Sequence, residues 1–559
     1  MVPLNSNLKR TPRANLKIFS GVLPDVLDCI ADLSSEEVFT PPDIANIILD
    51  QFPEEVWEDP SIKILDPVCK TGIFLREAVK RFFKGLEKTI PDPEDRLAYI
   101  LTQQVCGIAL TELTALVSRR SVYCSITANQ GNALLKDKNI FKNPEGNVIY
   151  VNYEHDFDES IPVEEQNCKI CGMSKRLVED LMEYENENHA YPFTHLTEEE
   201  LEEMKGRFDI IIGNPPYQMR VGDGSRPLAA SIYPDFVYQA IKLNPKQMSM
   251  IIPARWFTAG HRNVEKFREF MLSDPHIKTI TMIEDASTVF PGVDLKGGVC
   301  YFLRDTGWDN TKDGCIIKIG DVVQEESAEG VVSSVVKILS ESTLDRSSEN
   351  NTHVICHDLD RSIMTKVLSQ KEPSFASLVS RRMPFGMQTN FSEYTDTPSK
   401  NSVLLLTRGG KWKYVSPEYI TKNKKRVKEK KLYTPKASGG TSAGGVMSKP
   451  IMKIGESCCT ETYLIIGDPE RNFKAKELKS IASYMSTQFF HFMVRLLKTT
   501  QHATQKVYQY VPVQTWNRIW TDEELFAKYE LTPEEIERIK TKVRPVDWSD
   551  LYSDFDKCE

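Results

Sequence analysis

The stretch from Arg207 to Gln218, RFDIIIGNPPYQ, constrains the fold more than any other segment of this 559-residue chain. A short apolar run ends at a glycine and two prolines, which is typical of a buried parallel strand that stops abruptly. Ligands of such sheets bind outside the carboxyl ends of the strands, so we expect the chemistry at this turn. Pro215 and Pro216 lack N–H groups, and the turn therefore offers carbonyl acceptors and the Asn214 side chain. That arrangement suits a substrate amino group.

The tetrapeptide Asn214-Pro215-Pro216-Tyr217 resembles the catalytic signature of S-adenosylmethionine-dependent N6-adenine DNA methyltransferases. The resemblance implies that Asn214 Oδ1 and the Pro215 carbonyl accept the amino protons, which localises the nitrogen lone pair for attack on the sulfonium methyl. It also implies that Tyr217 stacks on a base rotated out of the duplex. Related tetrapeptides occur in methyltransferases of RNA bases and of protein glutamine, so the motif alone indicates amino-group methylation. The alternative, a strand that ends in a proline-rich turn, explains the prolines but not the whole tetrapeptide.

Two segments nearer the N-terminus predict a nucleotide-binding unit. Glu37 to Phe52 predicts a helix with Thr40 as N-cap and Pro41 as its first residue. Ile62 to Phe83 predicts a strand, a loop whose amides face a ligand, and a helix, although a plain strand-turn-helix is the alternative. Both segments resemble those that hold S-adenosylmethionine in this family. The implied cofactor-binding residues are Phe39, Thr40, Pro41, Asp66, Pro67, Lys70, Gly72, Phe74, Glu112 and Asn214.

Within that set, the resemblance implies that Asp66 binds the cofactor ammonium and that Gly72 allows close approach. Lys70 stands where the family usually has a glycine. If that position needs a positive φ, Lys70 is strained; alternatively, its ammonium reaches the cofactor carboxylate. Val105 to Arg120 predicts the second strand and a helix. Ala109 occupies the place of the usual ribose-binding acid, so Glu112 is the candidate, with a helix-surface glutamate as the alternative.

The segment from Ser121 to Glu200 is much longer than the roughly 30 residues of one βα unit, and we predict an insertion there. Cys168-Lys-Ile-Cys171-Gly172 has the spacing of a zinc knuckle. His155 and His189 are the predicted partners of Cys168 and Cys171, with Cys124 and His195 in reserve. Such an ion would be structural, because four protein ligands leave no open position. A pair of ordinary cysteines with surface histidines is the alternative.

His189 to Leu196 predicts the third strand. The resemblance implies an acid just after it that holds the cofactor adenine, and Glu198 is the candidate. The polar segment Val221 to Pro227 predicts a loop that closes over a flipped base. Strands and helices then alternate to about residue 320. Phe290 is either a wall of the adenine pocket or a core aromatic.

The order of motifs resembles the gamma arrangement of restriction-modification methyltransferases, which implies a C-terminal target-recognition region. Further resemblance to such regions lies at Thr460 to Tyr463 and at Lys498 to Pro512. Lys422 to Lys431 has seven basic residues, which predicts phosphate contacts or, alternatively, a solvated basic helix. Ser438 to Gly445 predicts a mobile loop, and Thr499 to Lys506 offers polar groups for base edges.

We therefore predict an α/β fold with a Rossmann-like methyltransferase domain built on a mixed seven-stranded sheet. The predicted division is an N-terminal extension at 1–36, a catalytic domain at 37–320 with the Cys/His insertion at 121–200, and a C-terminal α+β target-recognition and helical region at 321–559. From Trp520 onward the sequence predicts two capped helices.

Composition narrows the functional classes. No apolar run approaches the roughly 18 residues of a membrane span, and no signal peptide is recognisable, so we expect a cytoplasmic protein with its 12 cysteines reduced. The net charge of −9 means that any contact with nucleic acid must come from local basic patches.

These observations predict site-specific N6-adenine methylation of double-stranded DNA by base flipping, with S-adenosylmethionine as cofactor and a separate cognate restriction endonuclease as partner. One alternative is an RNA or protein-glutamine methyltransferase, although such enzymes usually lack so large a C-terminal region. The other is a non-catalytic DNA-binding subunit, which the departures at Lys70 and Ala109 would permit.

Overall fold

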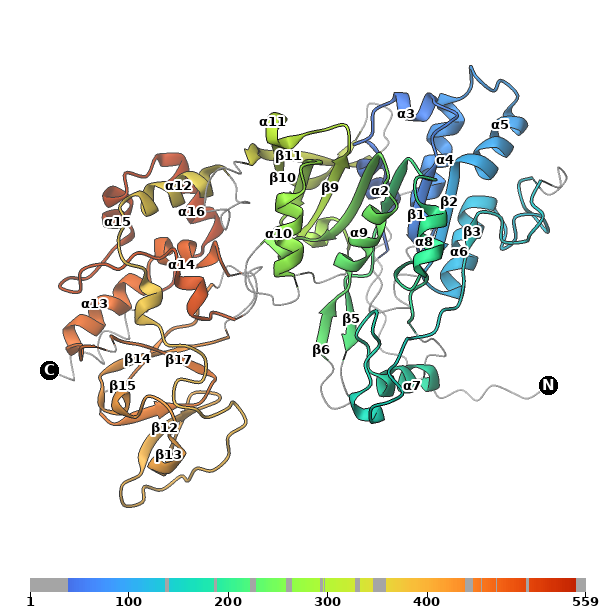
Figure 1. Cartoon of the computed structure of the whole chain (residues 1–559). Helices are drawn as coiled ribbons and strands as arrows, with labels where there is room; N and C mark the ends of the chain where they lie inside the picture. Colours follow the sequence, from blue (N-terminus) through green and yellow to red (C-terminus); the bar gives the residue numbers. More distant parts are fainter. Residues whose placement is uncertain are drawn as a thin grey trace.

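The computed structural model describes residues 39–135, 140–184, 189–221, 228–257, 264–291, 295, 297–326, 332–344, 358–437, 446–453, 455–468, 470–498 and 502–548. One large sheet with its helices forms a unit, called the catalytic unit because it carries the predicted catalytic turn. Two small sheets and a group of helices form a C-terminal unit, drawn from yellow to red in Figure 1.

The large sheet has nine strands in the order β11-β10-β8-β9-β7-β4-β1-β2-β3. The strands are β1 (Ile64–Cys69), β2 (Val105–Ala109), β3 (Val148–Ile149), β4 (Ile210–Gly213), β7 (Gln247–Pro253), β8 (Ile277–Ile283), β9 (Val299–Asp305), β10 (Cys315–Glu326) and β11 (Val332–Leu344). The predicted count of seven was too low, because the long antiparallel pair β10 and β11 extends the sheet beyond β8. Residue 320 lies inside β10, so the sheet continues past the predicted domain boundary.

Strands β1 and β4, which precede the predicted site, pair in parallel near the middle of the sheet, with Ile64 opposite Ile210. Both are buried, as their continuous apolar sequences predict. The antiparallel strand β9 lies between β7 and β8 and is not an edge strand. The predicted strand at His189 to Leu196 was wrong. Pro192–Thr194 is a short 3-10 helix, and the third strand is Val148–Ile149, inside the predicted insertion.

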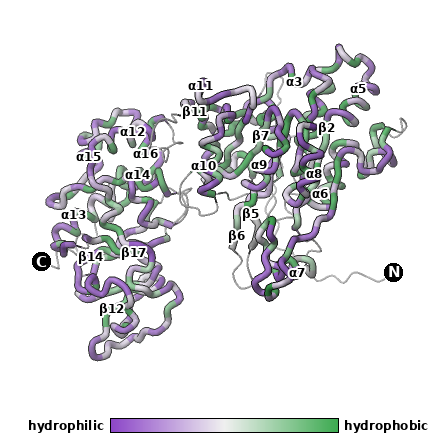
Figure 2. Tube along the Cα trace, viewed as in Figure 1, coloured by the Kyte–Doolittle hydropathy of each residue, from purple (hydrophilic) through white to green (hydrophobic). Residues whose placement is uncertain are grey.

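Helices cover both faces of the sheet, and hydrophobic residues concentrate along its strands (Figure 2). One core contains residues of α2 (Pro42–Leu49), α3 (Glu55–Glu58), α4 (Ile73–Gly85) and α6 (Glu112–Tyr123). The opposite core contains residues of α7 (Lys175–Tyr184), α8 (Glu198–Met204), α9 (Tyr233–Lys242) and α10 (Glu265–Ser273). A π-helix (Ile100–Gln104) adds Ile100 and Leu101 to the first core, and α5 (Pro93–Tyr99) packs against that core. The remaining elements are α11 (Asn310–Asp313) and the hairpin of β5 (Gln218–Val221) and β6 (Leu228–Ser231).

In the C-terminal unit, one small sheet has the order β13-β12-β16 and the other β15-β14-β17. Their bounds are β12 (Val403–Thr407), β13 (Lys411–Val415), β14 (Lys431–Pro435), β15 (Ile451–Lys453), β16 (Ser457–Cys459) and β17 (Tyr463–Ile466). The helices are α12 (Asp358–Ser369), α13 (Ala475–Met485), α14 (Gln488–Arg495), α15 (Asp522–Lys528) and α16 (Pro533–Lys542).

Both capped helices predicted after Trp520 are confirmed as α15 and α16, each with a capping box. Among the described residues, no helix combines the length and the apolar composition needed to cross a membrane.

Candidate active site

The predicted catalytic turn follows β4 directly, and its four residues Asn214 to Tyr217 are all buried. The amide nitrogen Nδ2 of Asn214 donates a hydrogen bond of 3.0 Å to Oγ1 of Thr40, which lies 174 positions earlier in the chain. This bond fixes the orientation of the Asn214 amide group and identifies which of its two terminal atoms is Oδ1, the hydrogen-bond acceptor. The structure thus joins two segments that the sequence analysis had placed at one site on the basis of resemblance.

Thr40 was predicted as the N-cap of the first helix, and this was wrong. The N-cap is Pro41, the helix begins at Pro42, and no side chain caps it. The cap lies one residue later than predicted because both Pro41 and Pro42 fit a helix start, where a missing N–H costs nothing. The Thr40 hydroxyl is therefore available to Asn214.

Gly213, the last residue of β4, permits the carboxyl ends of β1 and β4 to meet. A Cβ atom at this position would lie 2.6 Å from Val68 Cγ2 and 3.3 Å from Asp66 Oδ1. Such distances are too short for van der Waals contact with Val68. The glycine before the tetrapeptide is thus a packing requirement of the site, which the sequence analysis treated only as the end of a strand.

A small cavity at this junction brings the predicted cofactor loop against the catalytic turn. Its volume is about 10 Å³. Binding sites for drug-sized molecules are usually roughly 300–1,000 Å³, so the loop and the turn must separate to admit a ligand of that size. It is lined by Thr40, Asp66, Val68, Lys70, Thr71, Gly72, Ile73, Phe74 and Asn214.

Asp66 is 3% exposed, and its Oδ1 accepts a hydrogen bond of 3.0 Å from the Val68 amide. Burial raises the pKa of Asp66 to about 7, against the opposing effects of the bonds from Val68 and Cys69 and the charge of Lys70. A buried acid of this kind can exchange its proton for a ligand cation near neutral pH.

Lys70 is buried and lines the same cavity. Its φ is not positive, which excludes the predicted strain. The positive φ belongs to Gly72, at +70°, which is the N-cap of α4. A Cβ on Gly72 would lie 2.9 Å from the Ser118 backbone, so this glycine allows α6 to approach the loop.

Other predicted cofactor residues lie around the cavity. Pro67 is buried, Phe39 and Pro41 are half-buried, and Phe74 lines the wall. Glu112 is exposed in the first turn of α6 and is not among the lining residues. Glu198 is the candidate for holding the cofactor adenine, but the segment before it is not the third strand. Glu198 begins α8, and its carboxylate lies 3.7 Å from Lys242 Nζ.

Tyr217 is 4% exposed and packs against Phe290, with ring centroids 6.4 Å apart and planes at 64°. Phe290 is itself 2% exposed. The Tyr217 hydroxyl is buried and makes no hydrogen bond among the described residues. The ring of Tyr217 therefore depends on apolar packing, and Phe290 must shift before another ring can stack in its place. Most of the predicted loop Val221 to Pro227 lies outside the described residues.

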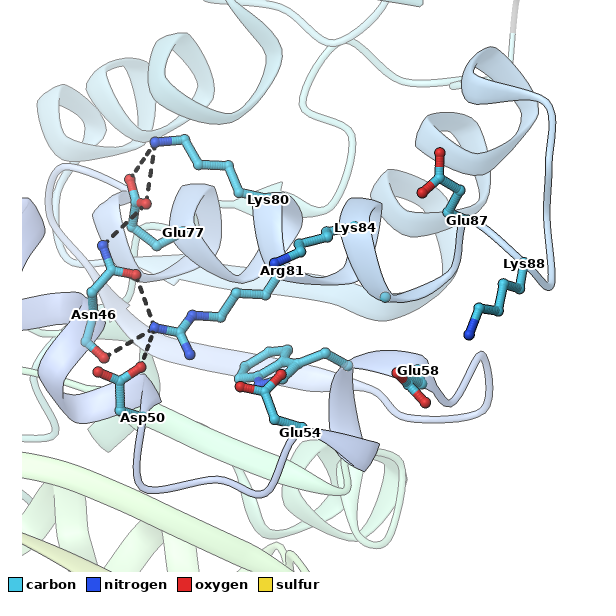
Figure 3. A pocket seen from close by; sticks show the side chains of 12 residues that line it. Asn46, Asp50, Glu54, Glu58, Glu77, Lys80, Arg81, Lys84, Glu87 and Lys88 are labelled. Carbon is cyan, nitrogen blue, oxygen red and sulfur yellow. Dashed lines mark hydrogen bonds and ion pairs between the residues drawn. The ribbon is translucent and has the colours of Figure 1, made fainter. Parts of the chain in front are cut away.

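A second hollow lies away from the catalytic turn, between α2, α3 and α4 (Figure 3). Oppositely charged side chains line this hollow. Arg81 pairs with Asp50 at 2.6 Å, and its guanidinium carbon lies 5.4 Å from the centroid of the Trp57 ring. Glu77 accepts hydrogen bonds from Lys80 and Asn46. The Arg81–Asp50 ion pair and the Asn46–Glu77 hydrogen bond join the α2 segment to α4, which favours the position of Thr40, two residues before α2, beside the catalytic turn.

Two cysteines and two histidines converge in the segment 121–200. The donor atoms of His155, Cys168, Cys171 and His195 all lie within 4.8 Å of one another. Cys171 Sγ is 3.3 Å from His155 Nδ1, and Cys168 Sγ is 3.9 Å from His195 Nε2. Ligands at normal Zn–S and Zn–N distances in a tetrahedron are separated by roughly 3.5 Å. The arrangement has the geometry of a four-ligand metal site.

Two further contacts suit a metal site. His195 Nδ1 lies 3.0 Å from the Tyr191 carbonyl, which fixes the proton on Nδ1 and leaves Nε2 toward the cysteines. The Ile170 amide donates to Cys168 Sγ at 3.4 Å, and Gly172 has a φ of +76°. The tight turn that CxxCG predicts is therefore present.

The structure does not bring the predicted ligand His189 into this group, and the reserve residue His195 lies there instead. The 3-10 helix Pro192–Thr194 turns His195 toward the cysteines, whereas His189 Nδ1 lies 3.5 Å from the Tyr191 hydroxyl. Cys124, the other reserve, is exposed at the end of α6 and is not in the group.

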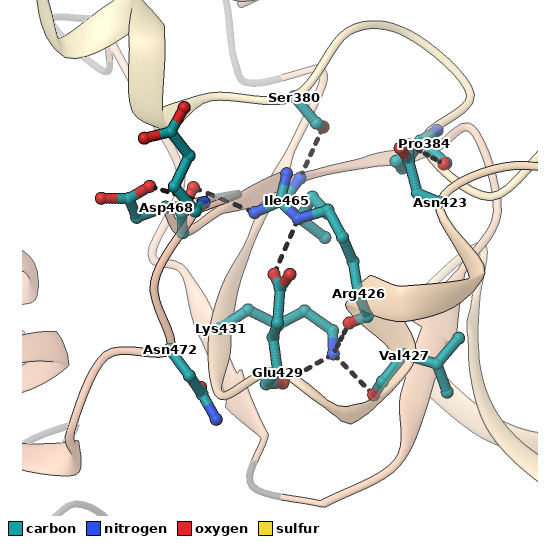
Figure 4. Close-up of polar contacts among 12 residues, drawn as sticks. Ser380, Pro384, Asn423, Arg426, Val427, Glu429, Lys431, Ile465, Asp468 and Asn472 are labelled. Atoms are coloured by element: carbon teal, nitrogen blue, oxygen red, sulfur yellow. Dashed lines mark hydrogen bonds and ion pairs between the residues drawn. The ribbon is translucent and has the colours of Figure 1, made fainter.

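The basic run from Lys422 to Lys431 is partly turned inward (Figure 4). The Lys431 amine donates to the carbonyls of Arg426, Val427 and Glu429 at 2.7, 3.0 and 2.8 Å. Burial lowers the pKa of Lys431 to about 8. Arg426 pairs with Glu429 at 2.7 Å and donates to the Gly467 carbonyl. The run is a 3-10 helix at Lys424–Lys428, and its exposed lysines are Lys422, Lys424, Lys425 and Lys428.

The segment Thr460 to Tyr463 connects the two small sheets. Glu461 is buried and contacts both Arg382 and Lys436, the latter at 2.6 Å. Next to it, Ala437 bridges His502. The predicted contact segments Ser438 to Gly445 and residues 499–501 lie outside the described residues. The described residues that border these two segments, Ala437 and His502, thus lie side by side.

Comparison with known proteins identifies a matching family and a similar protein. Residues 103–290 match the model of the family described as Eco57I restriction-modification methylase, a span that includes the catalytic turn, the Cys/His group and Phe290. A protein of Mycoplasma pneumoniae (strain ATCC 29342 / M129 / Subtype 1), described as an uncharacterized adenine-specific methylase, is 38% identical over 309 residues. The match covers 52% of this chain and 71% of that protein.

Solved structures of restriction-modification enzymes are also similar. The type IIG restriction endonuclease BpuSI aligns over 92% of this chain and 62% of its own, with 11% identity and a TM-score of 0.38. A nuclease-deletion mutant of the type ISP enzyme LlaGI, in complex with a DNA substrate mimic, aligns over 86% of this chain and 46% of its own, with 10% identity and a TM-score of 0.46. This chain covers less than two thirds of the length of either structure.

Proposed function

This chain belongs to the adenine-specific methylases, and we propose that it transfers a methyl group from S-adenosylmethionine to the N6 amino group of adenine in a specific sequence of double-stranded DNA. The methylation would serve as the modification step of a restriction-modification system. A separate endonuclease that cuts the unmodified sequence would complete that system. The observation that carries the proposal is the cavity in which Asp66 and Lys70 of the β1 loop meet Thr40 and Asn214.

Asn214 is the residue to which we assign recognition of the target amino group. With Nδ2 committed to Thr40, Oδ1 accepts one amino proton and the Pro215 carbonyl accepts the other. These bonds draw the lone pair out of conjugation with the ring. The new N–C bond forms as the C–S⁺ bond breaks, and the amino nitrogen then loses a proton to solvent. A strong base is not required, because the methylated nitrogen is acidic before that loss.

The cavity residues fit the amino-acid end of S-adenosylmethionine, which supplies an electrophilic methyl group when bound. We propose that Asp66 binds its ammonium and Lys70 its carboxylate, since a buried acid and a buried base line one small cavity. Phe39, Pro41, Pro67 and Phe74 would pack around it. Glu112 keeps its proposed role at the ribose from the first turn of α6.

The decisive experiment compares acceptors. Labelled cofactor should transfer its methyl group to unmethylated genomic DNA, and sequencing should then locate N6-methyladenine within one motif. Transfer to RNA or to protein glutamine, with none to DNA, would favour the first alternative. Failure to bind S-adenosylmethionine in calorimetry, by a folded protein that binds DNA, would favour the non-catalytic subunit.

Binding of the cofactor should depend on pH through Asp66. In the protein without cofactor, the pKa of Asp66 is raised to about 7. Below that pH, Asp66 is protonated in most protein molecules and must release its proton before it binds the cofactor ammonium. Affinity should therefore increase about tenfold between pH 6 and pH 8, measured by calorimetry. Asp66→Asn should bind more weakly and without this dependence. Equal affinity of the unaltered protein at both values would contradict the role of Asp66.

Tyr217 should tolerate loss of its hydroxyl but not of its ring. Tyr217→Phe is expected to keep most of the activity, because the buried hydroxyl makes no hydrogen bond among the described residues. Tyr217→Ala should lose about 1–3 kcal/mol of base stacking. A mismatched partner opposite the target adenine should restore part of the loss, since it lowers the cost of flipping. A Tyr217→Phe enzyme as inactive as Tyr217→Ala would argue against stacking.

We propose that His155, Cys168, Cys171 and His195 bind one structural zinc ion. The donor set and its spacing fit a closed tetrahedral site, and each ligand is buried or half-buried. The site would brace the segment that holds Tyr191 and Phe193, both of which pack on Phe236 of α9. Metal analysis of protein purified without chelator should give about one zinc per chain.

DNA contacts are assigned to the C-terminal unit. Arg382 and Lys436 beside Glu461, together with the exposed lysines of the basic run, would bind phosphates. Lys424 and Lys425 are both exposed in that run. The region thus supplies local positive charge on a chain whose net charge is −9.

A further inference from the structure

Glu284 directly follows β8, and three positively charged side chains of the C-terminal unit lie near its carboxylate. Its carboxylate is 2.8 Å from Lys542 Nζ, 3.8 Å from an Arg495 guanidinium nitrogen and 3.9 Å from one of Arg538. Lys542 and Arg538 belong to α16, and Arg495 ends α14. One acid of the catalytic unit is therefore the meeting point of two helices from the other unit.

The contact between the two units is sensitive to loss of the Glu284 carboxylate, because the side chains around it are positively charged. Arg538 is held separately by a bidentate pair with Asp360 of α12, at 2.7 and 3.0 Å. Arg495 and Lys542 then share Glu284, and the surrounding cations hold its pKa at about 2 although burial opposes this. Without the carboxylate, like charges would face one another at the contact between the two units.

The segment that follows Glu284 forms a wall of the candidate active site. The Phe290 amide donates to the Ala286 carbonyl at 2.8 Å, and the Phe290 ring packs on Tyr217. At the far end of the segment, Gly298 has a φ of +77°, and a Cβ there would lie 2.3 Å from the Ile283 carbonyl oxygen. The backbone at Glu284 is thus closely tied to the wall of the catalytic turn.

The helices that reach Glu284 pack against one of the small sheets, β15-β14-β17. Leu432 of β14 and Ile466 of β17 share one hydrophobic core with α12, α13, α14 and α16. Val379, near the start of the C-terminal unit, also bridges Ile466. Because this core is closely packed, its sheet residues and the helices that contact Glu284 are expected to move together.

We propose that Glu284 is a positioning residue that docks the C-terminal unit onto the wall of the catalytic turn, so that DNA held by that unit presents its target base to Asn214. The proposal rests on the proposed function. Glu284 touches neither the cofactor cavity nor the catalytic turn, and it acts through Arg495, Arg538 and Lys542.

The test uses Glu284→Gln in the full chain, with Glu372→Gln as the matched control. Glu372 loses the same charge and has a similar side-chain exposure, 22% against 26%, but its partner Lys528 lies in its own unit at 2.6 Å. Glu284→Gln should lower kcat for DNA methylation about ten- to hundredfold, as expected for a misplaced substrate. Its affinity for S-adenosylmethionine and for DNA should change less than twofold, and Glu372→Gln should resemble the unaltered enzyme.

Two further variants separate positioning from folding. Glu284→Asp keeps the charge and should recover part of kcat. Lys542→Gln should cost less when combined with Glu284→Gln than when made alone, because the two residues share one contact. Normal kcat in Glu284→Gln, strictly additive effects, or an equal loss of cofactor binding would each overturn the proposal.

Docking can also be measured without catalysis. Small-angle scattering of Glu284→Gln should show a larger radius of gyration than that of the unaltered protein, and Glu372→Gln should not. An unchanged radius would refute the docking role even if the enzyme methylates DNA. Conversely, if the unaltered protein methylates no DNA, the proposed function fails while the scattering result still decides whether Glu284 docks the units.

Discussion

Replacement of Asn214 by alanine is expected to lower the rate of methyl transfer about 10²- to 10³-fold, the usual effect of removing one hydrogen-bonding group that acts on the reacting centre. The Asn214 side chain is 3% exposed and fixed by Thr40, so its Oδ1 is oriented before the substrate arrives. Because this contact is made mainly to the reacting amino group, binding of cofactor and DNA should remain close to normal. Single-turnover kinetics would measure the chemical step separately from product release.

The matched variants for this prediction are at Thr40. Thr40→Val keeps the volume but removes the acceptor for Asn214 Nδ2, and it should cause a smaller loss, about tenfold in the chemical step. Thr40→Ser keeps the hydroxyl and should lose less. An Asn214→Ala enzyme with the normal rate would move the active site elsewhere, and equal activity of Thr40→Val and the unaltered enzyme would show that the bond to Thr40 does not orient the amide.

Replacement of His195 by alanine is expected to remove the zinc ion, whereas replacement of His189 by alanine should leave it bound. Of these two histidines, His195 directs a ring nitrogen at Cys168 and His189 is not in the group, and a structural zinc site contributes free energy of folding directly. His195→Ala should therefore lower the melting temperature by several degrees and make the segment near Tyr191 susceptible to protease. Metal content per chain and thermal unfolding measure the two effects.

His195→Cys distinguishes loss of a ligand from loss of a buried ring. A thiolate can replace the imidazole as a zinc ligand, so this variant should retain metal and most of the stability. Zinc bound equally by His195→Ala and the unaltered protein would refute the ligand set. So would a zinc-free preparation of the unaltered protein that is fully folded and active.

Local chemistry made much of this protein predictable from its sequence. A buried apolar run followed by glycine and two prolines is typical of the end of a strand, and the structure ends β4 at Gly213. Hydrophobic periodicity and capping residues likewise predicted the helix after the first strand, α4, and the two capped helices α15 and α16. The tight CxxCG turn also follows from short-range geometry. These features depend on residues that are neighbours in the chain.

Tertiary structure alone decided which distant residues meet. Spacing cannot show that Thr40 contacts Asn214 across 174 positions, that His195 rather than His189 faces Cys168, or that nine strands pair instead of seven. Lys70 proved unstrained because the positive φ falls on Gly72. Glu284 gave no signal at all, since an acid after a strand is common and its three cations lie more than 200 residues away. Such contacts depend on how packed elements orient their side chains, which a one-dimensional pattern does not specify.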